Sequence, residues 1–115
     1  MKGSVRHRTR PRVKNAAPIF FALGDETRLA LVARLGSAGP QSIAQLSEGA
    51  DVTRQAITKH LEVLSSAGLV SSEWRGRERI WNFEAGELDQ ARRFLDDVSS
   101  QWDQALARLR TFVER

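Results

Sequence analysis

The chain has 115 residues, of which 41% are hydrophobic and 28% are charged, a composition typical of one folded domain and not of a disordered protein. It contains no cysteine, which excludes a disulfide scaffold, a thiolate zinc site, an iron–sulfur cluster and a cysteine nucleophile. The longest apolar run, residues 16–23, is too short to cross a membrane, and no signal-peptide pattern follows the basic start; we therefore expect a cytoplasmic protein without a membrane partner.

The net charge of +4 is unevenly distributed along the chain. Residues 1–14 carry six basic side chains and no acidic one, whereas residues 15–115 carry 12 basic and 14 acidic side chains. The first segment is also poor in apolar residues, so we expect a disordered basic arm at 1–14 and one folded domain over 15–115. Because this domain has a net charge of −2, the charge of the whole chain does not identify its partners.

Two helices are predicted at the start of the folded domain. Pro18 lacks the N–H that the first helical turn does not need, so it is expected to begin a short helix that ends near Gly24. Asp25 is expected to cap a second helix, residues 26–37, which ends before Gly39. The side chains of this helix that are predicted to face inward are Leu29, Val32, Ala33 and Leu35.

A short helix and a longer one follow, separated by a tight turn. Ser42 and Gln45 have the spacing of a capping box, which predicts a helix over 43–48. Thr53 is expected to cap a helix over roughly 54–67, with Gly68 at its end. The apolar positions of this helix follow the i, i+4, i+7 spacing of one inward face: Ile57, Leu61 and Leu64.

Two runs rich in β-branched and aromatic residues indicate a β-hairpin. They span residues 69–74 and 79–83, and a glycine lies at the reversal in Arg75-Gly76-Arg77-Glu78. The faces of Trp74 and Ile80, and with them the register of the hairpin, stay open.

The last predicted helix, residues 87–114, carries a heptad seam about 40 Å long. Such a seam can pack within its own chain, but the other predicted helices are too short to cover it, so we expect a second copy of the chain to do so. Ile19, Phe20 and Phe21 are candidates to complete this surface. The seam consists of Leu88, Ala91, Leu95, Val98, Trp102, Ala105, Leu109 and Phe112.

The order of the predicted elements contains a helix-turn-helix followed by a β-wing. With the apolar face of the 54–67 helix turned inward, a helical wheel places Gln55, Lys59 and Glu62 outward. Arg54 and Thr58 lie on the flanks of that polar face. Glutamine pairs with adenine, lysine with guanine and a threonine methyl group with thymine, so this face is suited to reading bases. The alternative is a solvated amphipathic helix without a specific partner.

Three arginines, Arg75, Arg77 and Arg79, cluster at the glycine reversal of the hairpin. A basic hairpin tip is able to reach a minor groove or a phosphate, although charged tips also occur for solubility alone. The two elements together, in this order, indicate nucleic-acid binding.

Four stretches resemble the ArsR-type winged-helix transcriptional regulators: FALGDETRL from Phe21, RQAITKHLEVL from Arg54, AGLV from Ala67 and GRER from Gly76. The similarity spans about residues 16–113. It implies a mainly α fold with a small β-hairpin, about five helices plus the wing, and a long C-terminal dimerisation helix. It also implies a homodimer that binds an inverted-repeat operator and usually represses transcription.

The resemblance further implies roles for individual residues. Gln55, Thr58 and Lys59 would face bases, Thr53 and Arg54 would approach the DNA backbone, and Arg75–Arg77 would form the wing tip.

Metal-sensing members of that family use clustered cysteines before the reading helix, or His and acidic ligands in the last helix, and neither set occurs here. The segment FLDDVSSQWDQAL from Phe94 instead resembles a metal-independent subgroup of the family, and we expect neither a metal nor a cofactor. His60 is expected to be packed or to bond a phosphate. No nucleophile motif lies beside His7 or His60 and no phosphate-binding glycine loop occurs, so we expect no enzymatic activity.

We therefore expect a dimeric, sequence-specific DNA-binding repressor. The expected dimer interface comprises Ile19, Phe20, Leu88, Leu95, Val98, Trp102, Leu109 and Phe112. The alternative is a protein-interaction module that binds nucleic acid only non-specifically, through its basic arm. The sequence does not specify the operator, the regulated genes, or a small-molecule or protein effector.

Overall fold

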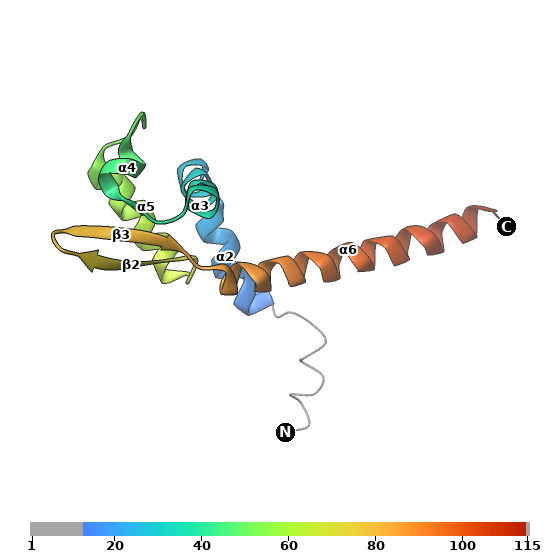
Figure 1. Cartoon of the computed structure of the whole chain (residues 1–115). Helices are drawn as coiled ribbons and strands as arrows, with labels where there is room; N and C mark the ends of the chain where they lie inside the picture. Colours follow the sequence, from blue (N-terminus) through green and yellow to red (C-terminus); the bar gives the residue numbers. More distant parts are fainter. Residues whose placement is uncertain (1–12, 115) are drawn as a thin grey trace, which may run out of the picture.

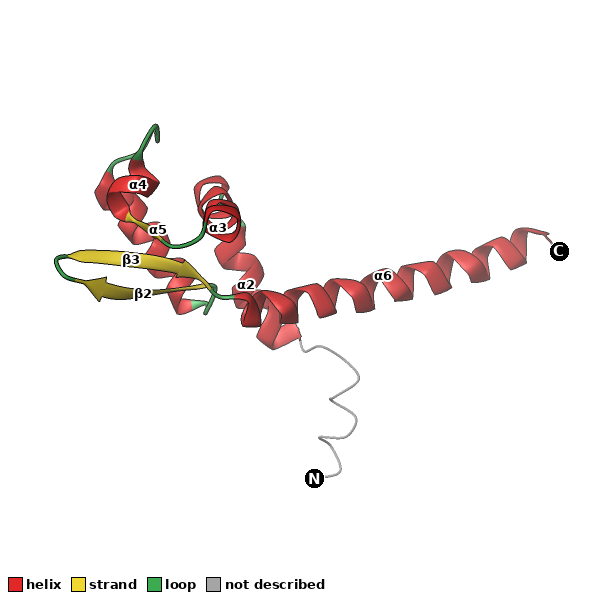
Figure 2. Ribbon diagram, in the orientation of Figure 1, coloured by secondary structure: helices red, strands yellow, loops and turns green. Residues whose placement is uncertain are grey.

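The computed structural model describes residues 13–114, which form five helices and a three-stranded antiparallel sheet (Figures 1 and 2). This confirms the predicted mainly α fold with a small β-wing and a long last helix. In chain order the elements are α2 (Val13–Leu23), α3 (Glu26–Ala38), β1 (Gln41–Ser42), α4 (Ile43–Ser47), α5 (Arg54–Ser66), β2 (Val70–Arg75), β3 (Glu78–Phe83) and α6 (Ala85–Glu114).

Helix α2 is already formed at Val13, so Pro18 lies inside the helix and the expectation that Pro18 begins it was wrong. Proline removes the N–H that would bond the carbonyl four residues earlier, that of Lys14. Both residues are exposed, so water can bind that carbonyl instead. Residues 1–12 of the predicted arm lie outside the described residues, and its last two, Val13 and Lys14, belong to the helix.

Helix α3 begins as predicted, since the Asp25 side chain accepts a hydrogen bond from the backbone N–H of Arg28 at 3.0 Å. The inward face predicted for α3 is confirmed only in part. Val32 and Leu35 are buried together with Leu31, whereas Leu29 and Ala33 are exposed. Leu29 and Ala33 lie two residues from Leu31, about 200° around the helix, and this helix has apolar residues on every side.

The capping box at Ser42 and Gln45 is confirmed, with each side chain bonded to the backbone amide of the other residue. The same Ser42 also ends β1, a two-residue strand that was not predicted. Gln41 and Ser42 pair with Trp81 and Ile80 of β3, so β1 attaches the start of α4 to the hairpin.

The hairpin register, which the sequence left open, pairs Trp74 with Arg79 and Arg75 with Glu78. Gly76 and Arg77 form the two-residue turn. Gly76 has a φ of +65° and Arg77 does not have a positive φ, which is the pattern of a type II′ hairpin turn.

One core lies between the helices and the inner face of the sheet. It includes the predicted face of α5, and Trp81 of β3 is fully buried within it. The start of α6 joins this core through Ala91. The other buried hydrophobic residues of the cluster are Ile19, Ala22, Leu31, Val32, Leu35, Leu46, Ile57, Leu61, Leu64, Leu69 and Val70.

Helix α6 has 30 residues and extends away from the rest of the molecule (Figure 1). With this helix included, the molecule is 66 Å long in its longest dimension. Only its first part packs on the body, chiefly against α2, where Phe20 and Phe94 meet edge to face at 5.9 Å. Within the described residues no helix is long and apolar enough to cross a membrane.

Candidate nucleic-acid interface

Helices α4 and α5 form a helix-turn-helix in which α5 presents a polar face. Its opposite face is anchored in the core by Ile57, Leu61 and Leu64. Gln55 and Lys59 are exposed on the side away from these three residues, as the helical wheel predicted. The helix is thus held by one side and offers a glutamine amide and a lysine ammonium group on the other.

The start of α5 is held by its own side chains. Thr53 Oγ1 accepts the backbone N–H of Ala56 at 3.0 Å, which confirms Thr53 as the N-cap. The Thr58 hydroxyl donates to the carbonyl of Arg54 at 2.9 Å, which leaves its methyl group and oxygen lone pairs for a ligand. The Arg54 side chain is exposed beside the positive end of the helix dipole, a position that favours an anion.

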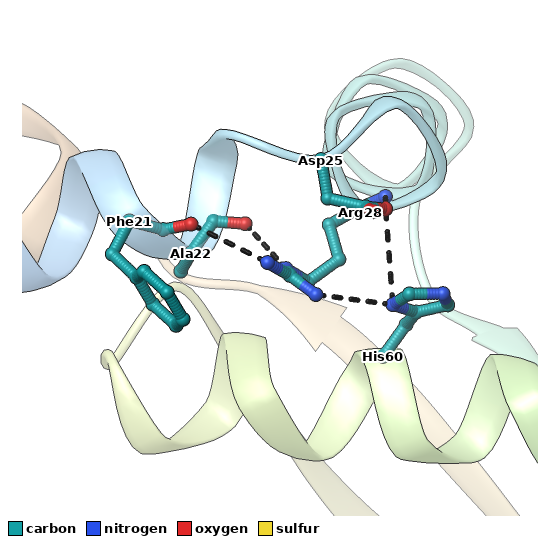
Figure 3. A network of polar contacts seen from close by, with 5 residues as sticks. All are labelled: Phe21, Ala22, Asp25, Arg28 and His60. Carbon is teal, nitrogen blue, oxygen red and sulfur yellow. Dashed lines mark hydrogen bonds and ion pairs between the residues drawn. The ribbon is translucent and has the colours of Figure 1, made fainter.

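A network of polar contacts that sequence reasoning missed connects α5 to α2 and α3 (Figure 3). His60 of α5 lies beside Arg28 of α3, with 3.2 Å between His60 Nδ1 and Arg28 Nη1. Arginine only donates hydrogen bonds, so this contact suits the tautomer of His60 whose Nδ1 carries no proton. Asp25 Oδ2 lies 3.8 Å from the same Nδ1.

The rest of the Arg28 guanidinium caps the end of α2. Its Nε donates to the carbonyl of Ala22 at 2.6 Å and its Nη2 donates to that of Phe21 at 3.4 Å (Figure 3). Carbonyls at a helix C-terminus lack partners within the helix, and a cation there is favourable. One side chain therefore bridges α2, α3 and α5, and His60 is packed in this bridge. The only trace of this network in the sequence is the spacing of Asp25 and Arg28. That spacing predicts the N-cap of α3 but not the contacts of Arg28 with α2 and His60.

Arg34 is a second residue whose structural role the sequence analysis did not predict. Its guanidinium donates to the carbonyls of Gln45 at 2.7 Å and Leu46 at 3.4 Å, at the end of α4. Arg34 thus fixes α4, and with it the turn that leads into α5.

Asp25 makes the network sensitive to acid. The hydrogen bond from the Arg28 amide lowers the pKa of Asp25, against a smaller opposing effect of partial burial. A group whose folded pKa lies below its unfolded value stabilises the fold above the unfolded pKa and loses that contribution as the pH falls through the folded pKa. We therefore expect the midpoint temperature of thermal unfolding to fall more between pH 6 and pH 2 in the wild type than in Asp25→Asn.

Asparagine keeps the cap but does not titrate, so Asp25→Asn isolates the charge, and Asp25→Ala serves as the variant that loses the cap. Parallel acid profiles of the wild type and Asp25→Asn would contradict this assignment.

The three wing arginines occupy different environments. Arg77 lies exposed at the turn, and Arg75 lies beside it in an exposed ion pair with Glu73 at 3.0 Å. Arg79 is instead directed toward the root of the hairpin, where its guanidinium carbon lies 4.4 Å from the centre of the Trp81 ring and its Nε donates to Ser72 Oγ at 2.9 Å. Arg75 and Arg77 are therefore the arginines that this turn exposes, and Arg75 is engaged by Glu73 of its own strand.

The predicted dimer residues differ in their exposure on one chain, and the four exposed ones all lie on α6. Leu95 and Trp102 are 53% and 64% exposed, and Leu109 and Phe112 further along the helix are exposed as well. Val98 is half-buried, and Phe20 and Leu88 are half-buried against the core of their own chain. Ile19 is 1% exposed and belongs to that core. Among residues 13–114, no three His, Asp or Glu side chains gather in a way that could hold a metal ion.

A helix-turn-helix domain model matches residues 23–73 of the chain. The uncharacterized HTH-type transcriptional regulator YuzN of Bacillus subtilis is 39% identical over 75 residues, which cover 60% of this chain and 82% of that protein. The HTH-type transcriptional regulator Rv2034 of Mycobacterium tuberculosis is 36% identical over 74% of this chain and 76% of that protein. The structure of an ArsR-like transcriptional regulator from Rhodococcus sp. RHA1 superposes with a TM-score of 0.73 at 36% identity, covering 86% of this chain and 92% of that one.

Proposed function

Since this chain belongs to the ArsR-type winged helix-turn-helix transcriptional regulators, which bind DNA and are not enzymes, we propose that it is a homodimeric repressor of an inverted-repeat operator. The observation that carries the proposal is the division of α5 into a buried apolar face and an exposed polar face. A helix of this kind enters the major groove with its polar side chains toward the base edges.

In this proposal three side chains of α5 read bases. The Gln55 amide pairs with adenine, the Lys59 ammonium group binds guanine, and the Thr58 methyl group contacts thymine. The remaining candidates on this helix, Thr53 and Arg54, lie at its N-terminus and approach the phosphate backbone. Their role is to fix the depth and angle of α5 in the groove.

The wing adds contacts beside the major groove. Arg75 and Arg77 reach a phosphate or the adjacent minor groove from the exposed turn. Arg79 supports the hairpin instead, because its guanidinium is stacked on Trp81 and bonded to Ser72.

The apolar faces of α2 and α6 supply the dimer interface. Much of the α6 stripe lies beyond the body of its own chain (Figure 1), so a second copy is the partner that buries it. In the proposed dimer the two α5 helices lie about 34 Å apart, one turn of duplex, which is the spacing that an inverted repeat requires. A dimer bound to two half-sites within a promoter covers that DNA and blocks access to it. This is why we propose repression. The proposed interface residues are Phe20, Leu88, Leu95, Val98, Trp102, Leu109 and Phe112.

Selection from a random pool of duplexes tests the function directly. The full chain is expected to enrich an inverted repeat with half-sites about 10–10.5 base pairs apart, bound by two protomers. Scrambling one half-site should weaken binding, and the affinity should fall with salt by a slope of about 0.9 per phosphate contact. A promoter reporter carrying the repeat is expected to lose output. Enrichment of no sequence, or of a single half-site bound by one protomer, would contradict the proposal.

Deletion of residues 1–12 separates this function from non-specific binding through the basic arm. The deletion stops before Val13 because Val13 and Lys14 belong to α2. Preference for the selected repeat over scrambled DNA should survive, since α5 and the wing are intact. Loss of all DNA binding would favour the interaction-module alternative.

A further inference from the structure

Trp74 is a large aromatic side chain that the wing leaves in solvent, with 68% of it exposed. It lies on β2, one residue before the Arg75–Glu78 pair that closes the turn. Exposed apolar residues are common singly, but a tryptophan is rarely left uncovered because it is the largest apolar side chain. The exposure of Trp74 therefore points to a partner outside the chain.

The register shows which face of the hairpin carries Trp74. It pairs directly with Arg79, and Ser72 pairs with Trp81, so all four side chains share one face of the β2–β3 ribbon. Trp81 is the buried end of this row and Trp74 is the end toward the turn. The core reaches only the root of the hairpin, and Trp74 lies beyond it.

Arg79 is the neighbour best placed to cover Trp74, and it does not. Its guanidinium turns toward the root, over the Trp81 ring at 4.4 Å and onto Ser72 Oγ at 2.9 Å. This cation–π contact and hydrogen bond hold Arg79 away from the turn. The Trp74 ring is thus left open at the same turn that presents Arg75 and Arg77.

The position of the wing in the molecule points to the partner of this ring. The hairpin turn lies at the end of the molecule opposite the C-terminus of α6 (Figure 1), so Trp74 is remote from the apolar stripe proposed for dimerisation. Arg75 lies on the opposite face of the ribbon and is paired with Glu73, so the exposed Arg77 of the turn is the cation beside Trp74 that favours a polyanion. An aromatic ring next to an exposed cation suits a minor groove, where the sugars of the walls offer an apolar surface between two rows of phosphates.

We propose that Trp74 is a DNA-contacting residue that packs in the minor groove flanking each half-site while Arg77 holds an adjacent phosphate. The proposal rests on the proposed function, because it requires the wing to lie on DNA. Its distinctive consequence is a contact that releases no counterion, so it adds affinity without adding salt dependence.

Salt titration distinguishes this contact from that of the neighbouring arginine. With the selected operator, Trp74→Ala is expected to lower the affinity about tenfold at every salt concentration and to leave the slope of log K against log salt unchanged. Arg77→Ala, the matched variant in the same turn, should reduce that slope by about 0.9. Trp74→Phe, which keeps an aromatic ring, should lose less affinity than Trp74→Ala. Thermal unfolding of each variant controls for folding, and little change is expected because both side chains are exposed.

Fluorescence gives a second readout, since the chain has three tryptophans in different places. Trp81 is fully buried and Trp102 lies on α6, so operator binding should change chiefly the emission of Trp74. The change should disappear in Trp74→Phe, which leaves the other two tryptophans in place.

Each outcome has a separate meaning. A wild type that shows no preference for any selected sequence would overturn the proposed function and this proposal with it. Wild-type binding that is unaffected by Trp74→Ala, or a fluorescence change that persists in Trp74→Phe, would overturn the Trp74 proposal alone.

Discussion

Replacing Gln55, Thr58 and Lys59 together by alanine is expected to remove the preference of the protein for its selected operator, with a loss of affinity of at least about a hundredfold. Each base contact of this kind contributes about 1–3 kcal/mol of discrimination, and about 1.4 kcal/mol corresponds to tenfold. Contacts on one helix are coupled, so the total loss falls short of the sum. Binding to scrambled DNA should fall much less, because phosphate contacts at the helix start and the wing remain.

Band-shift titration against the operator and its scrambled version measures this loss. Ser65→Ala with Ser66→Ala is a matched control, since both serines are exposed at the far end of α5. The triple variant should remain folded, because the buried face of α5 is untouched and alanine is a strong helix former. Full operator affinity in the folded triple variant would exclude α5 as the reading helix.

Leu95→Asp with Trp102→Asp is expected to convert the dimer to monomers. Both side chains are more than half exposed on one chain and lie on the same stripe of α6, at the centre of the proposed interface. Association would bury the two introduced carboxylates on each chain against apolar side chains, and burial of an unpaired charge costs several kcal/mol. The monomer should also bind the inverted repeat far more weakly, because it engages one half-site at a time.

Sedimentation or light scattering at several concentrations measures the change in mass. Ser100→Asp with Gln104→Asp adds the same charge to exposed positions about opposite the stripe, and this variant should stay dimeric. Circular dichroism should show a folded body in both variants, because the four positions lie outside the core of one chain. The monomeric variant is expected to unfold at a lower temperature than the wild type, since it has lost the stabilisation that association provides. A dimer that survives Leu95→Asp with Trp102→Asp would place the interface elsewhere.

Much of the fold followed from local chemistry. The caps at Asp25, Ser42 and Thr53 were predicted from a side chain and a backbone amide three residues apart, and the structure contains all three hydrogen bonds. The apolar spacing of α5 predicted its buried face for the same reason, since the helical period sets which side chains share a side. The glycine at position 76 marked the hairpin turn through its conformational freedom.

The errors came from residues whose surroundings are set at long range. The pattern of α3 has apolar side chains all around, so only the packing of neighbouring elements decided that Leu31 and not Leu29 is buried. Strand β1 has only two residues. It forms because the backbone of β3, nearly forty positions later in the chain, is free on one edge to pair with Gln41 and Ser42.

The same division holds for the candidate interface. The sequence by itself determined which side chains α5 turns outward and that a basic turn follows, because helical and strand periods are local properties. Tertiary structure alone decided that Arg28 ties His60 to the end of α2, that Arg79 packs on Trp81 while Trp74 remains in solvent, and that Ile19 is buried in its own chain. These facts depend on which elements meet in space, and a side chain's partners across such contacts leave no periodic trace along the chain.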